Sequence, residues 1–278
     1  MCKKSVSKRI TALEFRSLCV IGMGYIGLPT ASIFASQGLQ VTGMDVNQDI
    51  TNGLRAGQLH IFEPGLREAV LEALKAGRLT ISGEVQPADA FIIAVPTPFY
   101  EDKRADMRAV IAASESIVPH LKKGNLVILE STSPPRTTLD IVAPILEKSG
   151  LKAGEDFLLA YSPERVLPGK ILSELVENPR VIGGINRASA EAGRDLYQTF
   201  VKGEIILTDA TTAETVKLME NTSRDINIAI ANEFARLAQQ FDVDIWEAIS
   251  IANRHPRVEI LRPGVGVGGL CISVDPWF

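Results

Sequence analysis

Residues 18–45 constrain the fold more than any other stretch of the chain. An apolar run at residues 18–21 is followed at once by the sequence G-M-G-Y-I-G at 22–27. A helix-like stretch at 28–37 and a second apolar run at 39–44 come next, and the second run ends at Asp45. Short apolar runs of this kind form buried parallel strands. Strand, glycine turn, helix, strand and acid make up the full context of a dinucleotide-binding unit, so the sequence predicts a Rossmann-like α/β fold.

The three glycines and the acid have separate tasks in such a unit. Gly22 permits the tight turn, Gly24 lets the backbone approach a pyrophosphate, and Gly27 lets the helix pack on the strand. The helix amino terminus offers free N–H groups and a positive dipole end to the phosphates. Asp45 favours a free ribose 2′-OH and repels a 2′-phosphate, so we expect NAD rather than NADP. A glycine-rich turn without a ligand is the alternative.

Apolar runs and helical patterns then alternate along the chain. Further strands are expected at residues 91–95, 126–129, 157–161, 181–184 and 204–208, and helices at 65–75, 107–120, 137–149 and 188–200. Such alternation predicts a doubly wound, mainly parallel sheet. Residues 211–240 read as one long helix without glycine or proline, and a second helix is expected at 244–253. We therefore expect a nucleotide-binding domain at residues 1–208 and a helical segment at 209–278.

Composition excludes several classes of protein. The net charge of −4, with lysines and arginines scattered along the chain, gives no basic field for nucleic acid. No apolar run approaches the roughly twenty residues of a membrane span. The three cysteines, Cys2, Cys19 and Cys271, are too few and too widely separated for a disulfide framework. We expect a cytoplasmic protein without a metal site and without a membrane or nucleic-acid partner.

The loops after the expected strands are the candidate ligand sites, because ligands of open parallel sheets bind beyond the carboxyl ends of the strands. Thr97 lies between two prolines after the run at 91–95, and Thr132 follows the run at 126–129. Helix capping is an equally good explanation of Thr132. Glu164 and Arg165 follow the run at 157–161, where the alternative is an ordinary solvated pair.

Two further groups of residues lie in the helical segment. Lys217, Asn221 and Arg224 are spaced four and three apart, so they share one face of the long helix. Such a stripe is usually only the solvated face of an amphipathic helix. Cys271 follows a glycine-rich loop and precedes Asp275 by four residues. It is either a nucleophile or a structural cysteine in a tight loop.

Together these motifs resemble the UDP-glucose/GDP-mannose dehydrogenases, NAD-dependent enzymes that oxidise a nucleotide-sugar alcohol to the acid in two steps. The resemblance runs from about residue 15 to residue 278. It is based on six motifs: the glycine turn with Tyr25, Val95-Pro96-Thr97-Pro98, Ser131-Thr132, Ser162-Pro163-Glu164, Lys217 with Asn221, and Gly268-Gly269-Leu270-Cys271 with Asp275. Residues 162–169, 253–258 and 274–278 look more like the UDP-N-acetyl-D-mannosamine dehydrogenase branch than the UDP-glucose branch.

The resemblance implies roles for individual residues. Cys271 matches the nucleophile that captures the C6 aldehyde, and Lys217 the acid/base and oxyanion partner, supported by Asn221. Asp275 and Thr132 match the residues that position water for thioester hydrolysis, and Glu164 is a further acid/base candidate. The cofactor positions are Gly22, Gly24, Tyr25, Ile26, Gly27, Asp45, Thr97 and Thr132. The substrate positions are Arg165, Val166, Lys217, Asn221, Arg224, His255, Arg257 and Gly268.

The chain departs from the family pattern in two respects. Leu270 stands where the family usually has a histidine. The family also continues into a carboxy-terminal UDP-binding domain, which we expect residues 1–278 to lack, so little turnover is expected from these residues by themselves. The helical segment forms the dimer core in the family, which implies a homodimer with a central dimerisation and catalytic domain at 209–278.

Three functions stay open at this point. The first is oxidation of UDP-N-acetyl-D-mannosamine to UDP-N-acetyl-D-mannosaminuronate, a precursor of surface polysaccharides. The second is the same fold with another substrate, such as UDP-glucose or a small hydroxy acid, which would leave Cys271 without a task. The third is a non-catalytic remnant that only binds NAD or dimerises.

Overall fold

One sheet of eight strands organises the computed structural model, which describes residues 15–269 and 271–278. The strand order is β3-β2-β1-β4-β5-β6-β7-β8, and every pairing is parallel except that of β6 with β7. The strands are β1 (Ser17–Ile21), β2 (Gln40–Met44), β3 (Leu79–Ser82), β4 (Ala90–Ile93), β5 (Leu126–Leu129), β6 (Leu158–Tyr161), β7 (Arg180–Gly184) and β8 (Ile205–Asp209). The predicted Rossmann-like, mainly parallel α/β fold is confirmed.

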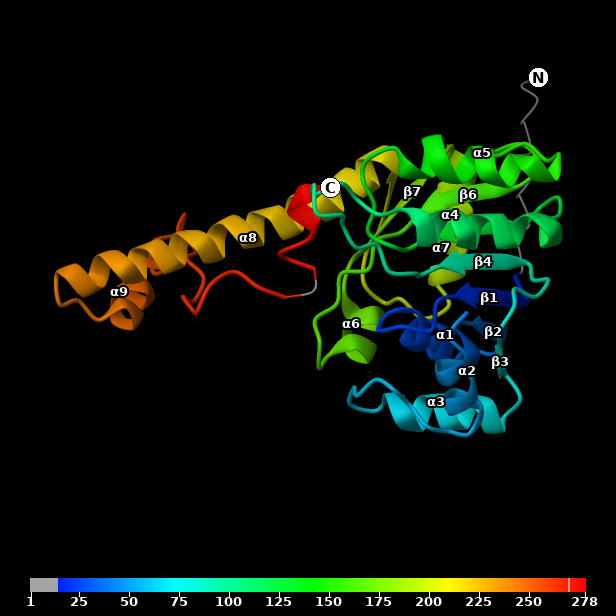
Figure 1. Ribbon diagram of the computed structural model, residues 1–278, viewed down its shortest axis with the longest axis horizontal. Helices are drawn as coiled ribbons and strands as arrows, with labels where there is room; N and C mark the ends of the chain where they lie inside the picture. Colours follow the sequence, from blue (N-terminus) through cyan, green and yellow to red (C-terminus); the bar gives the residue numbers. More distant parts are fainter. Residues whose placement is uncertain (1–14, 270) are drawn as a thin grey trace, which may run out of the picture.

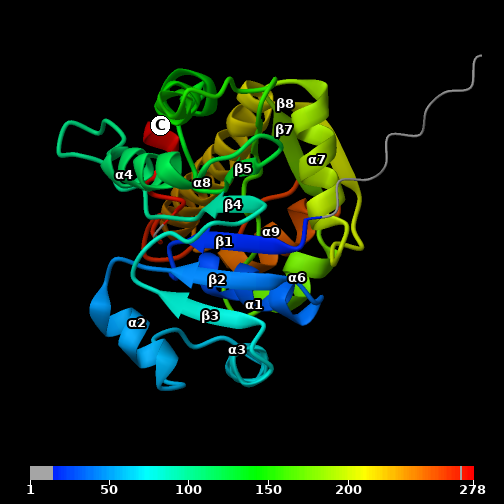
Figure 2. The ribbon, with the colours of Figure 1, turned by 90° about the vertical axis from the view of Figure 1, so that its right-hand side faces the viewer.

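Helices cover both faces of this sheet, and one of them projects far beyond it (Figures 1 and 2). The α-helices are α1 (Gly27–Ser36), α2 (Gln48–Arg55), α3 (Leu66–Lys75), α4 (Arg108–Ile117), α5 (Ala143–Leu146), α6 (Ile171–Glu177), α7 (Arg187–Tyr197), α8 (Ala210–Gln240) and α9 (Ile245–Ala252). Short helical turns are η1 (Val118–His120), η2 (Thr138–Val142), η3 (Glu147–Ser149) and η4 (Asp275–Trp277). Among the described residues, no helix is long and apolar enough to cross a bilayer.

The alternation of side chains along the strands builds two separate cores. In β1, Leu18 and Val20 pack with α1, α3, α6 and α7 on one face of the sheet. Cys19 and Ile21 point to the other face and pack with α4, α5 and the start of α8. Because successive side chains of a strand alternate in direction, a central strand covered on both faces is apolar throughout. Burial raises the pKa of the Cys19 thiol to about 11, as expected for a structural cysteine.

Three short elements were not predicted. These are the strand β3 and the helices α2 and α6. Only Leu79 of β3 is fully buried, because β3 lies at the sheet edge, so the run lacks the apolar character of the central strands. The single helix expected at 137–149 is instead a π-helical turn, η2, followed by α5 and η3. Pro144 has no N–H for a helical hydrogen bond, in keeping with this change of pattern.

The turn between β1 and α1 is built on very close backbone contacts. Gly22 has φ +97°, a conformation that favours glycine. A Cβ atom on Gly27 would lie 1.8 Å from the carbonyl oxygen of Gly22, whereas a Cβ atom on Gly24 would meet nothing within 4 Å. The fold therefore requires glycine at 22 and 27. At Gly24 the fold leaves open space.

The long helix α8 begins where β8 ends. Asp209 caps it by accepting a hydrogen bond from the N–H of Thr212 (2.9 Å). Ala210 and Ala213 belong to the core of the α/β domain, so α8 is anchored by its first turns. Its remaining length projects from the domain and carries α9 at the far end (Figure 1). From there the chain returns along α8 to η4.

This geometry predicts effects of very different size on stability for two glycine substitutions. Gly27→Ala should lower the free energy of unfolding by about 2 kcal/mol or more, because the new methyl group cannot fit against the Gly22 carbonyl. Gly24→Ala should change it by less than about 0.5 kcal/mol. Urea unfolding followed by circular dichroism measures both. Equal losses of stability in the two variants would contradict the interpretation that glycine is needed at position 24 for ligand approach and not for folding.

Candidate active site

The dinucleotide end of the site is formed by the glycine turn and the end of β2. The carboxylate of Asp45 accepts hydrogen bonds from the N–H groups of Met23 (2.8 Å) and Asn47 (2.9 Å). These bonds hold Asp45 against the turn. At Ile26, the N-cap position of α1, no side chain of the described residues caps the helix, so the positive end of the helix dipole is open to an anion. The N–H of Leu28 already donates to the carbonyl of Gly24 (3.1 Å). With the open space at Gly24, these features fit the pyrophosphate and ribose of a dinucleotide.

The loops after β4 and β5 lie side by side, because these strands are neighbours in the sheet. Thr97 and Thr132 are both half-buried in these loops. The hydroxyl of Ser131 donates a hydrogen bond to the carbonyl of Val95 (2.7 Å) and so ties one loop to the other. Thr97 and Thr132 thus lie at the same edge of the sheet as Asp45, as expected for ligand contacts.

The catalytic candidates of α8 meet the carboxy-terminal turn. Lys217, Asn221 and Asp275 are all buried. The side-chain amide of Asn221 donates a hydrogen bond to the carboxylate of Asp275. The carbonyl of Cys271 accepts a hydrogen bond from the N–H of Asp275 (2.9 Å), so the cysteine lies one turn before the aspartate. The buried side chains show that this part of the polar stripe is not a solvated helix face.

Electrostatic contact links the thiol, the ammonium and the carboxylate. Cys271 is exposed, but the surrounding protein still partly desolvates the thiol and raises its pKa. The Asp275 carboxylate raises that pKa further, whereas the Lys217 ammonium lowers it. Burial also raises the pKa of Asp275, against the hydrogen bond from Asn221 and the charge of Lys217. Lys217 is therefore the group that favours the thiolate here.

Glu164 and Arg165 are half-buried, and their side chains do not pair with each other. One carboxylate oxygen of Glu164 accepts from the N–H of Arg165 (2.6 Å), and the other binds the guanidinium of Arg180. Arg165 itself forms an ion pair with Glu220 of α8 (2.6 Å). Val166 packs against the core. Both arginines thus fasten the loop after β6, and Arg165 ties it to α8.

A buried polar cluster beneath this loop was not predicted. The guanidinium of Arg180 donates to Glu130 (3.3 Å) and to the hydroxyl of Ser162 (3.1 Å), and lies 4.2 Å from the ring centre of Tyr197. Burial raises the pKa of Glu130 to about 7 and Glu164 adds to this shift, whereas Arg180 opposes it. The signal that could have revealed the cluster is a charged residue, Glu130, directly after the wholly apolar strand β5.

Glu214 is a second unpredicted structural group near the site. Its fully buried carboxylate accepts hydrogen bonds from the N–H (2.8 Å) and hydroxyl (2.6 Å) of Thr138 and from the N–H of Arg136 (2.5 Å). These donors lie at the start of η2, just after the loop that carries Thr132. Glu214 therefore fixes the β5 loop to α8 one turn before Lys217.

The remaining predicted substrate positions are Arg224, Gly268, His255 and Arg257. Arg224 and Gly268 are exposed. His255 and Arg257 follow α9, near the far end of α8 (Figure 1). At 1.5 Å per residue, the helix from Lys217 to Gln240 is ~35 Å long. Within one chain, His255 and Arg257 are therefore far from Lys217. Leu270 and Cys2 lie outside the described residues.

Comparison with known proteins gives two family matches and close relatives. Residues 16–201 match the NAD binding domain of the UDP-glucose/GDP-mannose dehydrogenase family, and residues 211–278 match its central domain. A UDP-N-acetyl-D-mannosamine dehydrogenase of Methanococcus maripaludis is 53% identical over 269 residues, which are 95% of this chain and 61% of that protein. An NDP-N-acetyl-D-galactosaminuronic acid dehydrogenase of Ralstonia solanacearum is 49% identical, over 97% of this chain and 66% of that protein.

The fold is also that of a solved structure from the same family. The UDP-D-ManNAc dehydrogenase from Pyrococcus horikoshii superposes with a TM-score of 0.91 at 47% identity, over 94% of this chain and 63% of that one. The chain thus spans about three fifths of the length of these relatives. The two family matches cover nearly all of the described residues, and the chain belongs to the UDP-glucose/GDP-mannose dehydrogenase family.

Proposed function

We propose that this chain supplies the cofactor site and the catalytic residues of an NAD-dependent UDP-N-acetyl-D-mannosamine 6-dehydrogenase. The observation that carries the proposal is the cluster of Cys271, Lys217 and the Asn221–Asp275 pair, from two separate segments of the chain. The names of the relatives favour an N-acetylated sugar over glucose. The product is UDP-N-acetyl-D-mannosaminuronate, a building block for surface polysaccharides.

Each residue of the cluster has a chemical task in this proposal. NAD, when bound, takes up a hydride in each of the two oxidations. Cys271 attacks the C6 aldehyde and forms a C–S bond, and after the second oxidation water breaks the resulting thioester, releasing the acid and the thiol. Lys217 stabilises negative charge on the substrate oxygen, an effect worth up to a few kcal/mol in a dry site. Asp275 and Thr132 hold the hydrolytic water, and Glu164 is a further acid/base candidate.

We also infer a division of the chain near residue 208, supported by the two family matches. The relatives extend well beyond the matched length. We propose that this further length supplies most contacts to UDP, so the 278 residues by themselves turn over slowly or not at all, since remote binding energy aligns the sugar. A cytoplasmic location belongs to the same proposal, because Cys19 and Cys271 are unpaired thiols.

Replacing Cys271 tests the covalent mechanism. Cys271→Ser and Cys271→Ala should reduce formation of the uronic acid at least ~1000-fold, because no thioester can form. The protein assayed is a polypeptide that extends over the full length of the relatives. Chromatography of the reaction mixture measures the uronic acid formed. NAD titration is the control, since the cofactor site lies elsewhere and its affinity should not change. Full acid formation by Cys271→Ala would refute the mechanism, and failure to oxidise any UDP-sugar would favour a non-catalytic NAD-binding protein.

Replacing Asp45 tests the choice of cofactor. The parent chain should bind NAD more tightly than NADP, because the Asp45 carboxylate repels a 2′-phosphate. Asp45→Ala should reduce the ratio of the NADP dissociation constant to the NAD dissociation constant by about tenfold or more. Calorimetric titration of the 278 residues with both dinucleotides gives these constants. Equal affinity of the parent for NADP would show that Asp45 does not select the cofactor.

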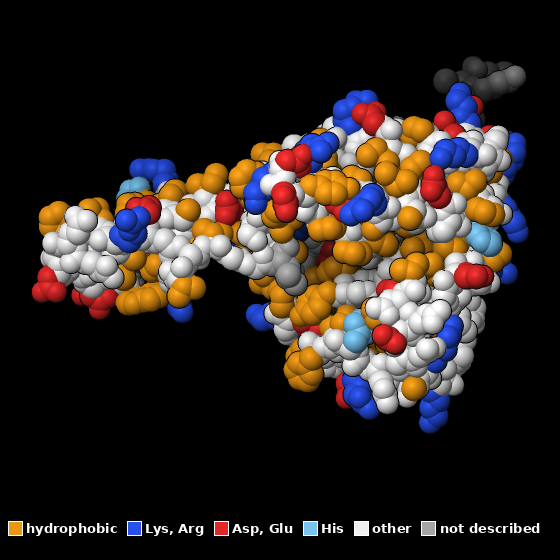
Figure 3. Space-filling model, in the orientation of Figure 1, with side chains coloured by type: hydrophobic (Ala, Val, Ile, Leu, Met, Phe, Trp, Pro, Cys, Tyr) orange, Lys and Arg blue, Asp and Glu red, His pale blue; other side chains and the backbone are white. Residues whose placement is uncertain are grey.

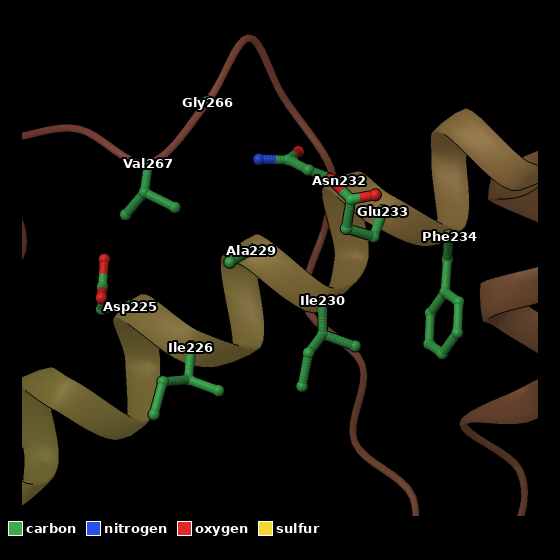
Figure 4. A pocket seen from close by; sticks show the side chains of 9 residues that line it. All are labelled: Asp225, Ile226, Ala229, Ile230, Asn232, Glu233, Phe234, Gly266 and Val267. Atoms are coloured by element: carbon green, nitrogen blue, oxygen red, sulfur yellow. The ribbon is translucent and has the colours of Figure 1, made fainter.

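The projecting part of α8 supports a homodimer as the form in which the protein acts. Ile226, Ile230, Phe234 and Leu237 are 42–52% exposed, and orange side chains follow the arm in Figure 3. Figure 4 shows Ile226, Ile230 and Phe234 pointing to the same side of the helix. Val216, nearer the start of α8, packs against the α/β core and does not belong to this stripe. A stripe of this length on a projecting helix is typical of a protein interface.

We propose that two α8 helices pack antiparallel through this stripe, which is a self-complementary arrangement around a two-fold axis. Antiparallel packing places the far end of one α8 beside the first turns of the other. His255 and Arg257, which lie near that far end, then come close to the partner's Lys217. The proposed substrate roles of these two residues thus belong to the neighbouring subunit's site.

Light scattering tests the assembly. The parent chain should have twice the mass of one chain at micromolar concentration, and Ile230→Glu with Phe234→Glu should be monomeric, because two charges cannot be buried at the interface. Lys202→Glu is the matched control, an exposed charge change on the α/β domain. A monomeric parent chain would contradict the dimer, as would a dimer that survives the double substitution.

A further inference from the structure

Glu63 joins two loops that lie far apart in the sequence. It lies in the connection between α2 and α3, and the residue is only 5% exposed. Its carboxylate accepts a hydrogen bond from the hydroxyl of Tyr25, in the glycine turn. The same carboxylate accepts the N–H of Gly169, at 2.8 Å and 3.0 Å to its two oxygens. A buried carboxylate thus bridges positions 25 and 169.

The Tyr25 side of this bridge belongs to the cofactor site. Tyr25 directly follows Gly24, where the fold leaves space for a pyrophosphate. The tyrosine is 41% exposed, so a ligand in the glycine turn can reach its side chain. The hydrogen bond to Glu63 raises the pKa of Tyr25 to about 12. The hydroxyl therefore keeps its proton and remains a donor at every physiological pH.

The Gly169 side belongs to the loop at residues 162–169, which follows β6. The start of this loop is held by the contacts of Ser162 and Glu164 to Arg180. Its end is held by the bond from Gly169 to Glu63 and by a hydrogen bond from the N–H of Leu167 to Glu174 (2.8 Å). Gly169 has φ +85°, a conformation that favours glycine. The loop carries Arg165 and Val166, two of the proposed substrate positions.

We propose that Glu63 is a positioning residue that couples occupation of the glycine turn by a dinucleotide to the conformation of the loop at residues 162–169. A dinucleotide packed over the exposed side of Tyr25 restricts the rotation of that ring. The Tyr25 hydroxyl then keeps its hydrogen bond to the Glu63 carboxylate, and that carboxylate keeps its hydrogen bond from the N–H of Gly169. Coupling between two sites is reciprocal, so an ordered loop also strengthens dinucleotide binding. The proposal rests on the proposed NAD site and requires no turnover.

Hydrogen exchange with and without saturating NAD tests this coupling in the full 278-residue chain. In the parent, NAD should slow exchange of the backbone amides of Arg165, Val166, Leu167 and Gly169 by at least about fivefold. Glu63→Ala and Tyr25→Phe should each abolish this NAD-dependent difference. Glu72→Ala, a change at an exposed glutamate of α3, is the matched control and should keep it. Glu63→Gln preserves the length and one acceptor oxygen, so it should restore part of the difference.

The ratio of exchange rates with and without NAD separates coupling from simple support of the loop. If Glu63 only supports the loop, Glu63→Ala speeds exchange equally in both states and the NAD-dependent ratio persists, which overturns the proposal. A parent that is saturated with NAD by calorimetry but shows no change at residues 165–169 also overturns it. Tyr25→Phe removes only a hydroxyl and provides the test should Glu63→Ala fail to fold. A parent that does not bind NAD refutes the proposed cofactor site itself, and this proposal with it.

Discussion

The antiparallel pairing of β6 with β7 determines where the rest of the site forms. Because β7 runs against β6, with Gly183 beside Tyr161, its first residue, Arg180, lies just beyond the carboxyl end of β6 and meets Glu164 there. Because β8 runs parallel to β7, β8 ends toward the opposite edge of the sheet, and α8 starts from that point. The helix then crosses back over the sheet and brings Lys217 and Asn221 to the edge where the dinucleotide turn lies. Six parallel strands by themselves do not place a helix there.

Buried charges hold the loops at this edge. Arg180 is shared by Glu130 and Glu164, and Glu214 accepts three hydrogen bonds from the start of η2. A buried charge is tolerated only when it is paired or fully hydrogen-bonded, so each of these groups specifies the position of its partners. Glu63 belongs to the same class, as a carboxylate buried between two loops. The loops that carry the candidate site residues are thus held by buried polar groups, and one of these groups, Glu164, is itself a candidate site residue.

Local sequence was enough to predict the nucleotide-binding half of the fold. The turn from Gly22 to Gly27, the acid at Asp45, and the long helix follow from glycine geometry, short apolar runs and helical spacing, which act between near neighbours in the chain. The resemblance to a known family added roles for Cys271 and Lys217. Elements at the sheet edge such as β3 were missed, because an exposed edge strand carries little apolar pattern.

Tertiary structure decided which residues from distant parts of the chain are in contact. Neither the contact of Asn221 with Asp275 nor that of Glu63 with Gly169 has a local signature, since their partners lie 54 and 106 residues apart. Their meeting depends on strand order and on the direction of β7, which are properties of the whole sheet. The separation of His255 and Arg257 from Lys217 likewise follows from the rigid length of α8. The sequence by itself determined which groups are present and the local turns that hold them; only the packing of distant segments determined which of them share a site.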